Sequence, residues 1–422
     1  MSTFYQDTAD PALRFPALAG DTEAEVAIIG AGFAGLATAL GLVERGTRDC
    51  LLLEAETVGA GASGRNGGFV FGGFSLDNAE LLRQLGPVQA RRLYGLTLDA
   101  VERIRGRIAK HAIDCDATYA GVLLANWFAD DKPLRELQRF MHEQFGVEWR
   151  WLPRDETRER LLTTRYHAAL HEPNAFHFHP LKYAQGLAGV LRDAGVRVHE
   201  GSRVSGIVRE GAGWRVDVED GARVDSAEVV VACGGYIGSL FPALSRAVLP
   251  IATYVMATEP LGESRLREAM RTDAAVYDTR FAFDYYRPLP DTRLLWGGRI
   301  SIRERTPQDV ARLLTSDLLR VYPQLEGVKV EHAWSGLMSY ARHKMPQIGR
   351  LPDGPWFAMG FGGHGVGPTT LAGEVLAAAL AGESPVPESF SRYGLPSTMG
   401  PLGLAGAQAT YWWYELRDFL RA

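Results

Sequence analysis

The pattern of apolar positions near the start of the chain predicts one β-α-β unit. Residues 26–29 form an uninterrupted apolar run, which is typical of a strand buried on both faces. Residues 33–45 are rich in alanine and leucine and predict a helix that ends at Gly46. Residues 51–53 predict a second strand, which ends at Glu54. These segments predict a Rossmann-like α/β domain, because a strand, a helix and a strand follow one another within about thirty residues.

Two later stretches alternate apolar and polar residues, as half-buried strands do. Residues 203–238 predict two strands with a turn at Asp220–Gly221, followed by a buried strand over 229–232. Near the C-terminus, residues 356–359 predict a strand that enters a glycine loop, with a helix from Thr369 onward.

Residues 283–299 predict two strands joined by a turn of proline and aspartate. Side chains alternate across a sheet, so Tyr285 and Arg287 share one face and Asp284 and Tyr286 share the other. The alternation leaves open which of the two faces meets a ligand.

Glycines at the first β-α turn have the spacing G-x-G-x-x-G. Gly30 permits the tight turn, Gly32 lets backbone N–H groups approach a pyrophosphate, and Gly35 lets the helix pack on the strand. Glu54 lies about twenty residues after Gly35, where an acid binds ribose hydroxyls. This unit predicts a dinucleotide site and does not by itself distinguish NAD from FAD.

Three more segments favour FAD. The Gly/Ser-rich loop 59–73, the glycines after the strand at 229–232 and the loop 360–367 each bring backbone close to a long ligand. The lone thiol of Cys233 is interpreted as a small buried filler rather than a nucleophile. The residues predicted to contact the cofactor are Gly30, Gly32, Phe33, Ala34, Gly35, Glu54, Ala55, Ala62, Ser63, Gly64, Arg65, Asn66, Gly67, Gly68, Val204, Cys233, Gly234, Phe361, Gly362, Gly363, His364, Gly365, Val366 and Gly367.

Composition narrows the class of protein. The chain has 422 residues, of which 46% are hydrophobic and 23% charged, as in ordinary globular proteins. The net charge of −5 argues against a nucleic-acid partner. Three widely spaced cysteines exclude a disulfide framework, and the N-terminus has no secretory pattern, so a cytoplasmic location is expected.

Four motifs carry a family resemblance: VAIIGAGFAGLATA, ASGRNGG, VVVACGG and MPQIGRLPDGPWFAMGFGGHGVG. In this order and spacing they resemble the D-amino-acid oxidase superfamily, and TYVMATEPL, DYYRPLPDTRLLWGGR and WYELRDFL resemble its γ-glutamylputrescine oxidoreductase group. The resemblance implies a discontinuous FAD domain (1–73, 173–245 and 335–398) into which an antiparallel-sheet substrate domain (74–172 and 246–334) is inserted, with a helical tail (399–422).

The resemblance also implies a reaction. FAD would be bound noncovalently, because no cysteine follows Cys233. A primary or secondary amine would be oxidised at a C–N bond to an imine that hydrolyses, and O₂ would be reduced to H₂O₂. The alternatives are a dehydrogenase of the same fold that passes electrons to a quinone or carrier, and a non-catalytic or tRNA-modifying flavoprotein. The segment 340–346, YARHKMP, departs from the expected pattern and leaves the choice between a γ-glutamyl polyamine and an amino-acid-like amine open.

Five residues are candidates for the substrate side: His364, Tyr285, Arg287, Arg299 and Tyr254. His364 could tune the flavin, act as a cation that steers oxygen, or simply pack beside the cofactor. Arg287 and Arg299 could bind a substrate carboxylate, since guanidinium pairs with carboxylate in a bidentate way, or could brace a sheet.

Two other features remain open. Three histidines at 171, 177 and 179 invite a metal interpretation, but they lack supporting ligands and flavin chemistry needs no metal, so no metal site is predicted. Residues 400–422 predict an aromatic-rich helix, which could pack on the protein body, on a partner subunit or at a membrane surface.

Overall fold

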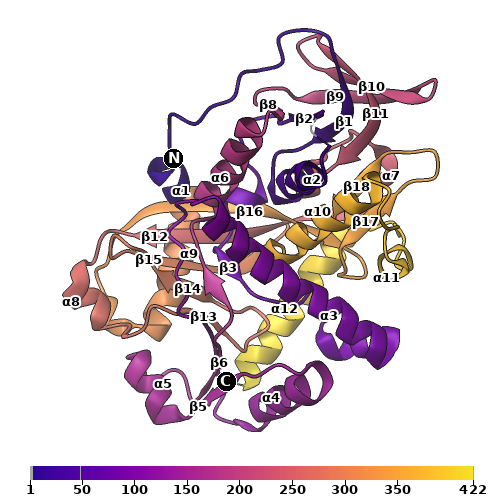
Figure 1. The fold of residues 1–422 in the computed structure, drawn as a ribbon. Coiled ribbons are helices and arrows are strands. Elements are labelled where there is room, and N and C mark those ends of the chain that lie inside the picture. The colour runs from indigo at the N-terminus through magenta and orange to yellow at the C-terminus, as the bar shows by residue number, and fades with distance from the viewer. Residues whose placement is uncertain (1–2, 48, 422) are drawn as a thin grey trace.

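The computed structural model describes residues 3–47 and 49–421, in which two eight-stranded sheets and a two-stranded ribbon carry the fold (Figure 1). The helices are α1 (Phe4–Thr8), α2 (Phe33–Glu44), α3 (Asn78–Lys110), α4 (Lys132–Phe145), α5 (Arg154–Arg160), α6 (Pro180–Asp193), α7 (Pro242–Ser245), α8 (Gly262–Arg267), α9 (Pro307–Val321), α10 (Val366–Leu380), α11 (Glu388–Ser391) and α12 (Pro401–Arg421). Short 3-10 turns lie at Ala62–Gly64, Gly234–Tyr236 and Pro323–Leu325.

The first sheet has the order β17-β18-β11-β1-β2-β8, and β10 and β9 extend from β11. Its strands are β1 (Thr22–Ile29), β2 (Cys50–Leu53), β8 (Arg197–His199), β9 (Val204–Glu210), β10 (Gly213–Val218), β11 (Arg223–Val231), β17 (Gln347–Arg350) and β18 (Trp356–Met359). The predicted β-α-β unit is present, because β1 and β2 are parallel and α2 connects them. The stretch 203–238 holds three strands, as predicted, but with different bounds: an additional turn separates β9 from β10, and the buried run is the end of β11 rather than a separate strand.

The second sheet has the order β16-β12-β15-β14-β13-β4-β6-β5 and lies below the first in Figure 1. Its strands are β4 (Val122–Ala125), β5 (Arg150–Leu152), β6 (Ala169–Glu172), β12 (Val248–Thr258), β13 (Ala275–Asp278), β14 (Tyr285–Pro288), β15 (Leu294–Ser301) and β16 (Val330–Ala341). The ribbon pairs β3 (Phe69–Val70) with β7 (Phe176–His177). The predicted strand pair within 283–299 is found as β14 and β15.

The boundary between the two sheets differs from the one expected at residue 335. β16 pairs with β12 along almost its whole length, from Val248 opposite Ala341 to Thr258 opposite Val330. Residues 335–341 therefore belong to the second sheet, and we propose that the nucleotide-binding part resumes only at β17.

Helix α3 packs against α10, a helix of the nucleotide-binding half, although its sequence was assigned to the second unit. Its buried Arg107 forms ion pairs with Glu44 of α2 at 3.0 Å and Glu374 of α10 at 2.5 Å. Gly86, with φ of 74°, and the following Pro87 interrupt the helix near its start. We propose that α3 joins the nucleotide-binding half, because the apolar residues of α3 share a core with those of β1 and α2.

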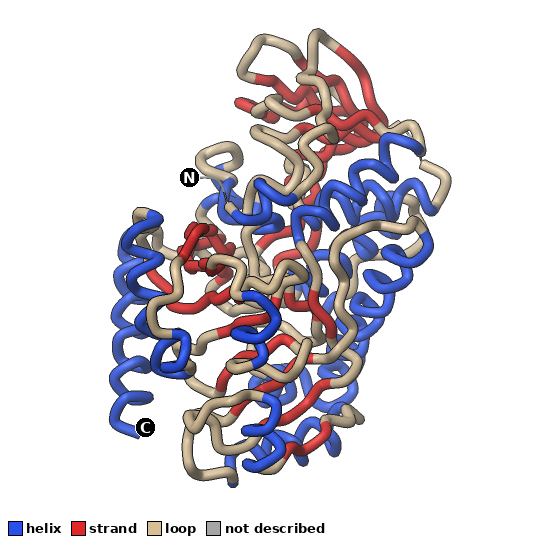
Figure 2. Tube along the Cα trace, turned by 90° about the vertical axis from the view of Figure 1, so that its left-hand side faces the viewer, coloured by secondary structure: helices blue, strands red, loops and turns tan. Residues whose placement is uncertain are grey.

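The predicted C-terminal helix is present as α12, which lies along one edge of the molecule and ends at the label C in Figure 2. Within residues 3–47 and 49–421, no helix has the length and apolar character needed to cross a membrane.

Candidate cofactor and active site

A large cavity of about 1540 Å³ lies between the two sheets. This volume exceeds the roughly 300–1,000 Å³ of most ligand pockets, so the cavity has room for a long cofactor and a second small molecule. One end is lined by the loops after β1, β2 and β11, and the other by strands of the second sheet and by α12.

The first β-α turn presents backbone N–H groups to the cavity. Gly30 has φ of 103°, a left-handed conformation that favours glycine. The N–H of Ala31 donates to the Glu54 carboxylate at 2.9 Å, and that of Phe33 donates to the Ser63 hydroxyl at 2.9 Å. A pyrophosphate fits this helix N-terminus because the helix dipole there favours negative charge. Burial raises the pKa of Glu54, which lies on the cavity wall beside this turn.

Gly35 acts through packing rather than through the cavity. A Cβ at Gly35 would lie 2.0 Å from the carbonyl oxygen of Gly30, so only glycine lets α2 approach the end of β1 this closely. Gly35 does not line the cavity. The same holds for two other predicted cofactor residues, Gly64 and Gly68.

The remaining predicted cofactor residues all line the cavity. They are Gly30, Gly32, Phe33, Ala34, Glu54, Ala55, Ala62, Ser63, Arg65, Asn66, Gly67, Val204, Cys233, Gly234, Phe361, Gly362, Gly363, His364, Gly365, Val366 and Gly367. Burial raises the pKa of the Cys233 thiol to about 12, which favours a packing role over a nucleophilic one.

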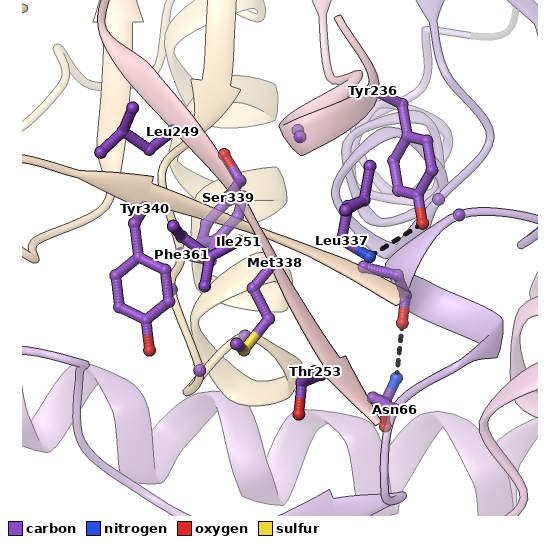
Figure 3. Close-up of a pocket in the computed structure, with 18 of the residues that line it drawn as sticks. Asn66, Tyr236, Leu249, Ile251, Thr253, Leu337, Met338, Ser339, Tyr340 and Phe361 are labelled. Atoms are coloured by element: carbon purple, nitrogen blue, oxygen red, sulfur yellow. Dashed lines mark hydrogen bonds between the residues drawn. The ribbon is translucent and has the colours of Figure 1, made fainter. Parts of the chain in front are cut away.

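One wall of the cavity is a face of strands β12 and β16, which the loop 360–367 touches at Tyr340. Leu249 pairs with Tyr340 and Ile251 with Met338, so these four side chains point to the same side (Figure 3). Phe361 closes the apolar wall from the loop before α10. Sequence reasoning missed Met338 and Tyr340, although their alternating positions in 337–341 were a usable signal.

Tyr236 was also missed, although it lies two residues after the predicted contact Gly234. Its hydroxyl accepts a hydrogen bond from the N–H of Leu337 at 3.1 Å, which joins the β11 loop to the second sheet (Figure 3). A bulky residue next to two glycines at a predicted cofactor loop was the signal available.

His364 lines the cavity, and its ring meets Phe71 edge-on with centroids 4.9 Å apart. Phe71 in turn stacks on Tyr277. Burial lowers the pKa of His364 to about 4, so the imidazole is neutral near pH 7. This disfavours the interpretation of His364 as an oxygen-steering cation and leaves the roles that a neutral ring can perform.

Tyr285 lines the cavity, whereas Tyr254 does not. The Tyr285 ring fits against two glycines, since a Cβ at Gly67 or Gly297 would lie within 2.6 Å of it. Burial raises the pKa of Tyr285, so its hydroxyl stays protonated. Tyr254 is buried in the core behind the sheet, and its hydroxyl donates to the carbonyl of Arg303 at 2.5 Å, so the predicted substrate contact of Tyr254 is not present.

Arg287 is buried and does not line the cavity. Its guanidinium donates to the carbonyl oxygens of Gly67 at 2.8 Å and Phe178 at 2.9 Å, and to the Tyr5 hydroxyl at 3.2 Å. It therefore braces the glycine loop from beneath, and the predicted pairing with a substrate carboxylate is not present.

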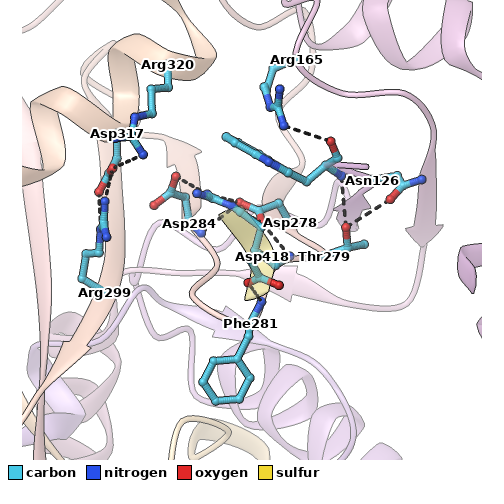
Figure 4. A network of polar contacts seen from close by, with 12 residues as sticks. Asn126, Arg165, Asp278, Thr279, Phe281, Asp284, Arg299, Asp317, Arg320 and Asp418 are labelled. Carbon is cyan, nitrogen blue, oxygen red and sulfur yellow. Dashed lines mark hydrogen bonds and ion pairs between the residues drawn. The ribbon is translucent and has the colours of Figure 1, made fainter. Parts of the chain in front are cut away.

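Arg299 lines the cavity but already has carboxylate partners. Its guanidinium binds the Asp317 carboxylate in a bidentate way at 2.7 and 2.8 Å (Figure 4). It also pairs with Glu415 of α12. Hydrogen bonding to Asp317 raises the pKa of Arg299. Arg299 thus ties β15 to α9 and α12, which makes it a positioning residue rather than a free anion-binding group.

A second arginine of the cavity wall, Arg280, is also paired. Its guanidinium lies 2.6 Å from the Asp278 carboxylate and 2.5 Å from the Asp284 carboxylate. Both carboxylates are labelled in Figure 4. Burial alone would lower the pKa of Arg280, but attraction to these two carboxylates raises it. The substrate side therefore offers no unpaired guanidinium from Arg280 or Arg299.

Comparison with known proteins agrees with this architecture. The sequence profile of the family described as FAD dependent oxidoreductase matches residues 25–379. The chain is 34% identical over 405 residues to the probable oxidoreductase OrdL of Haemophilus influenzae, which covers 94% of this chain and 92% of that protein. It is also 34% identical over 436 residues to the gamma-glutamylputrescine oxidoreductase of Escherichia coli, and this alignment covers 99% of this chain and 98% of that protein.

Solved structures share the fold at lower identity. Glycine oxidase from Geobacillus kaustophilus superposes with a TM-score of 0.72 at 21% identity, covering 89% of this chain and 98% of that one. L-proline dehydrogenase from P. horikoshii superposes with a TM-score of 0.72 at 19% sequence identity, and the match covers 88% of this chain and 97% of that one. Because the family profile spans most of the chain and both sequence relatives align nearly from end to end, the chain belongs to the DAO family of FAD dependent oxidoreductases.

Proposed function

We propose that this protein is an FAD-dependent amine oxidase. It converts the C–N bond of a primary or secondary amine to an imine that water hydrolyses, while O₂ is reduced to H₂O₂. The observation that carries the proposal is one cavity that is lined both by the glycine loops and by an apolar wall of Leu249, Ile251, Met338, Tyr340 and Phe361. The name of the E. coli relative supports an amine as substrate.

The charge distribution of the cavity favours a neutral amine. Among the described residues, the carboxylates on the cavity wall are Glu54, Glu56 and Glu219, which follow strands of the first sheet. An ammonium beside the apolar wall would lose water without gaining an anion, so entry lowers the pKa of the amine. When bound there, FAD supplies the two-electron acceptor for the carbon–hydrogen bond. The protein's own task is to hold the neutral amine and exclude water.

We expect kcat/KM to follow the ionisation of the substrate. Below the pKa of the free amine it should rise about tenfold per pH unit, because only the neutral form reacts. The ionisation of His364 should add no inflection to the pH profile of kcat/KM between about pH 5.5 and 8, because burial lowers the pKa of His364 to about 4. The measurement is kcat/KM against pH for wild type and His364→Gln, with the exposed His142→Gln as control. A step near pH 6–7 that disappears only in His364→Gln would contradict this assignment.

A carboxylate on the substrate would meet Arg342 and Lys344 rather than Arg287 and Arg299, the two arginines expected from the sequence. Arg342 and Lys344 line the cavity, are exposed, and form no ion pair within residues 3–47 and 49–421. They follow β16, beyond Tyr340 on the apolar wall. We propose an amine whose carboxylate lies several bonds from the reacting carbon, as in an extended γ-glutamyl amine, rather than a small α-amino acid.

The decisive experiment is an anaerobic screen of amines by loss of flavin absorbance, followed by assay of the active compounds in air. One H₂O₂ per imine formed is the expected result for an oxidase. Turnover only with a quinone or an artificial acceptor would identify the dehydrogenase instead. If no amine reduces the flavin, the remaining alternative is a non-catalytic or tRNA-modifying flavoprotein. We further propose that the protein works in the cytoplasm.

A further inference from the structure

The inner face of α12 is fixed to the protein body by three polar contacts. Glu415 pairs with Arg299, Asp418 accepts the N–H of Phe281 at 2.6 Å, and Gln408 accepts the N–H of Ile302 at 3.2 Å. The Tyr414 ring also stacks on Phe281, with centroids 4.3 Å apart. These contacts determine which side of the helix faces outward.

The outward side of α12 is apolar. Its large side chains are 50–79% exposed, and they are Leu402, Trp412, Trp413, Leu416, Phe419 and Leu420. The spacing of 412, 416, 419 and 420 places these residues on one stripe of the helix. Soluble surfaces rarely expose so many large apolar side chains together, so this stripe marks a contact surface.

The charges at the end of α12 differ in their partners. Its carboxylates, Glu415 and Asp418, have the inward partners described above. Its cations, Arg417 and Arg421, are exposed and have no carboxylate partner among the described residues, although the Arg421 guanidinium also lies over the ring of Phe128, 4.3 Å from its centroid. An apolar stripe with tryptophan, flanked by arginine, is the composition of a helix that lies in the interface of a bilayer. An anionic lipid surface attracts such cations.

The stripe is too small to hold a second copy of the chain by itself. A helix of 21 residues is about 30 Å long at roughly 1.5 Å per residue. A strip about 10 Å wide then offers on the order of 300 Å², against about 800 Å² per partner in a stable interface. A planar lipid surface needs no complementary shape and also attracts Arg417 and Arg421.

We propose that the outer face of α12 binds the surface of an anionic lipid bilayer, with the helix lying in the plane of the headgroups. The inference is independent of the amine chemistry, because it rests on residues that point away from the cavity. The opposite side of the same helix contributes Gln408 and Tyr411 to the cavity wall, so the lipid-facing helix is also part of the active-site enclosure.

The test uses the FAD-loaded full chain and flotation with vesicles. Wild type should float with phosphatidylcholine vesicles that contain about one third phosphatidylglycerol, much less with pure phosphatidylcholine, and less at high salt. Combining Trp412→Ser, Trp413→Ser, Phe419→Ser and Leu420→Ser should lower the bound fraction at least about tenfold. The flavin spectrum should stay normal, because these side chains are exposed and do not line the cavity.

Two control variants separate the contribution of the apolar stripe on α12 from that of exposed apolar side chains elsewhere and from that of the two arginines. Val88→Ser with Val208→Ser removes exposed apolar side chains elsewhere and should leave flotation unchanged. Arg417→Gln with Arg421→Gln should reduce binding to the anionic vesicles only. Wild type that fails to float with either vesicle, or a four-residue variant that floats like wild type, overturns the proposal. So does a dimer of the wild type that the same four substitutions dissociate, which would identify a second copy as the occupant.

Discussion

Gly32→Asp is expected to yield a folded but colourless protein that does not retain FAD. Gly32 caps α2 at the helix N-terminus and lines the cavity. A Cβ there would already lie 2.9 Å from the Ser63 hydroxyl oxygen, so the added carboxylate must extend into the cavity. It would occupy the place of the pyrophosphate and repel its negative charge at the site where the helix dipole favours an anion.

The measurement is the visible flavin absorbance of the purified protein, followed by titration with added FAD. Gly20→Asp is the matched control, because Gly20 is exposed and has open space for a side chain. Gly32→Ala should weaken FAD binding less, since its methyl group meets only the movable end of Ser63. A yellow Gly32→Asp protein with a normal flavin spectrum would falsify this placement of the pyrophosphate.

Arg299→Met is expected to destabilise the protein by about 3–5 kcal/mol, the usual cost of leaving one partner of a buried ion pair unpaired. The side chain of Asp317 is 1% exposed and receives both of its short hydrogen bonds from Arg299. Arg320 lies 3.7 Å away and cannot replace a bidentate partner. The same substitution releases Glu415, so α12 should also loosen over the cavity.

Thermal unfolding and steady-state kinetics measure this effect together. Arg299→Met with Asp317→Leu should recover most of the lost stability, because no uncompensated charge is then buried. Arg312→Met, which breaks an exposed pair with Asp309 on the same helix α9, should change stability by less than about 1 kcal/mol. If Arg299 bound the substrate carboxylate directly, Arg299→Met would instead keep wild-type stability and raise only KM.

The local elements of the fold were largely predictable because their signals are contiguous. The first strand, α2 and the second strand follow from periodicity and glycine spacing alone. The start of α10 was predicted three residues late, at Thr369 rather than Val366. Gly367 and Pro368 read as helix breakers, but proline is compatible with the first turn of a helix because its missing N–H has no partner there.

The sequence by itself predicted that glycine-rich segments far apart in the chain serve one dinucleotide cofactor, and most of these residues line one cavity in the structure. The tertiary structure decided which polar side chains are free to meet a substrate. Arg287 and Tyr254 alternate correctly on their strands, yet one is bound to Gly67 and the other to Arg303. The partners of Arg299 lie 18 and 116 residues away. Local sequence patterns reflect the secondary-structure propensity and the burial of each residue. Pairing between residues far apart in the chain depends instead on how the two sheets and α12 pack. That packing decides whether a charged side chain is already bound to a protein partner or is free to bind a substrate.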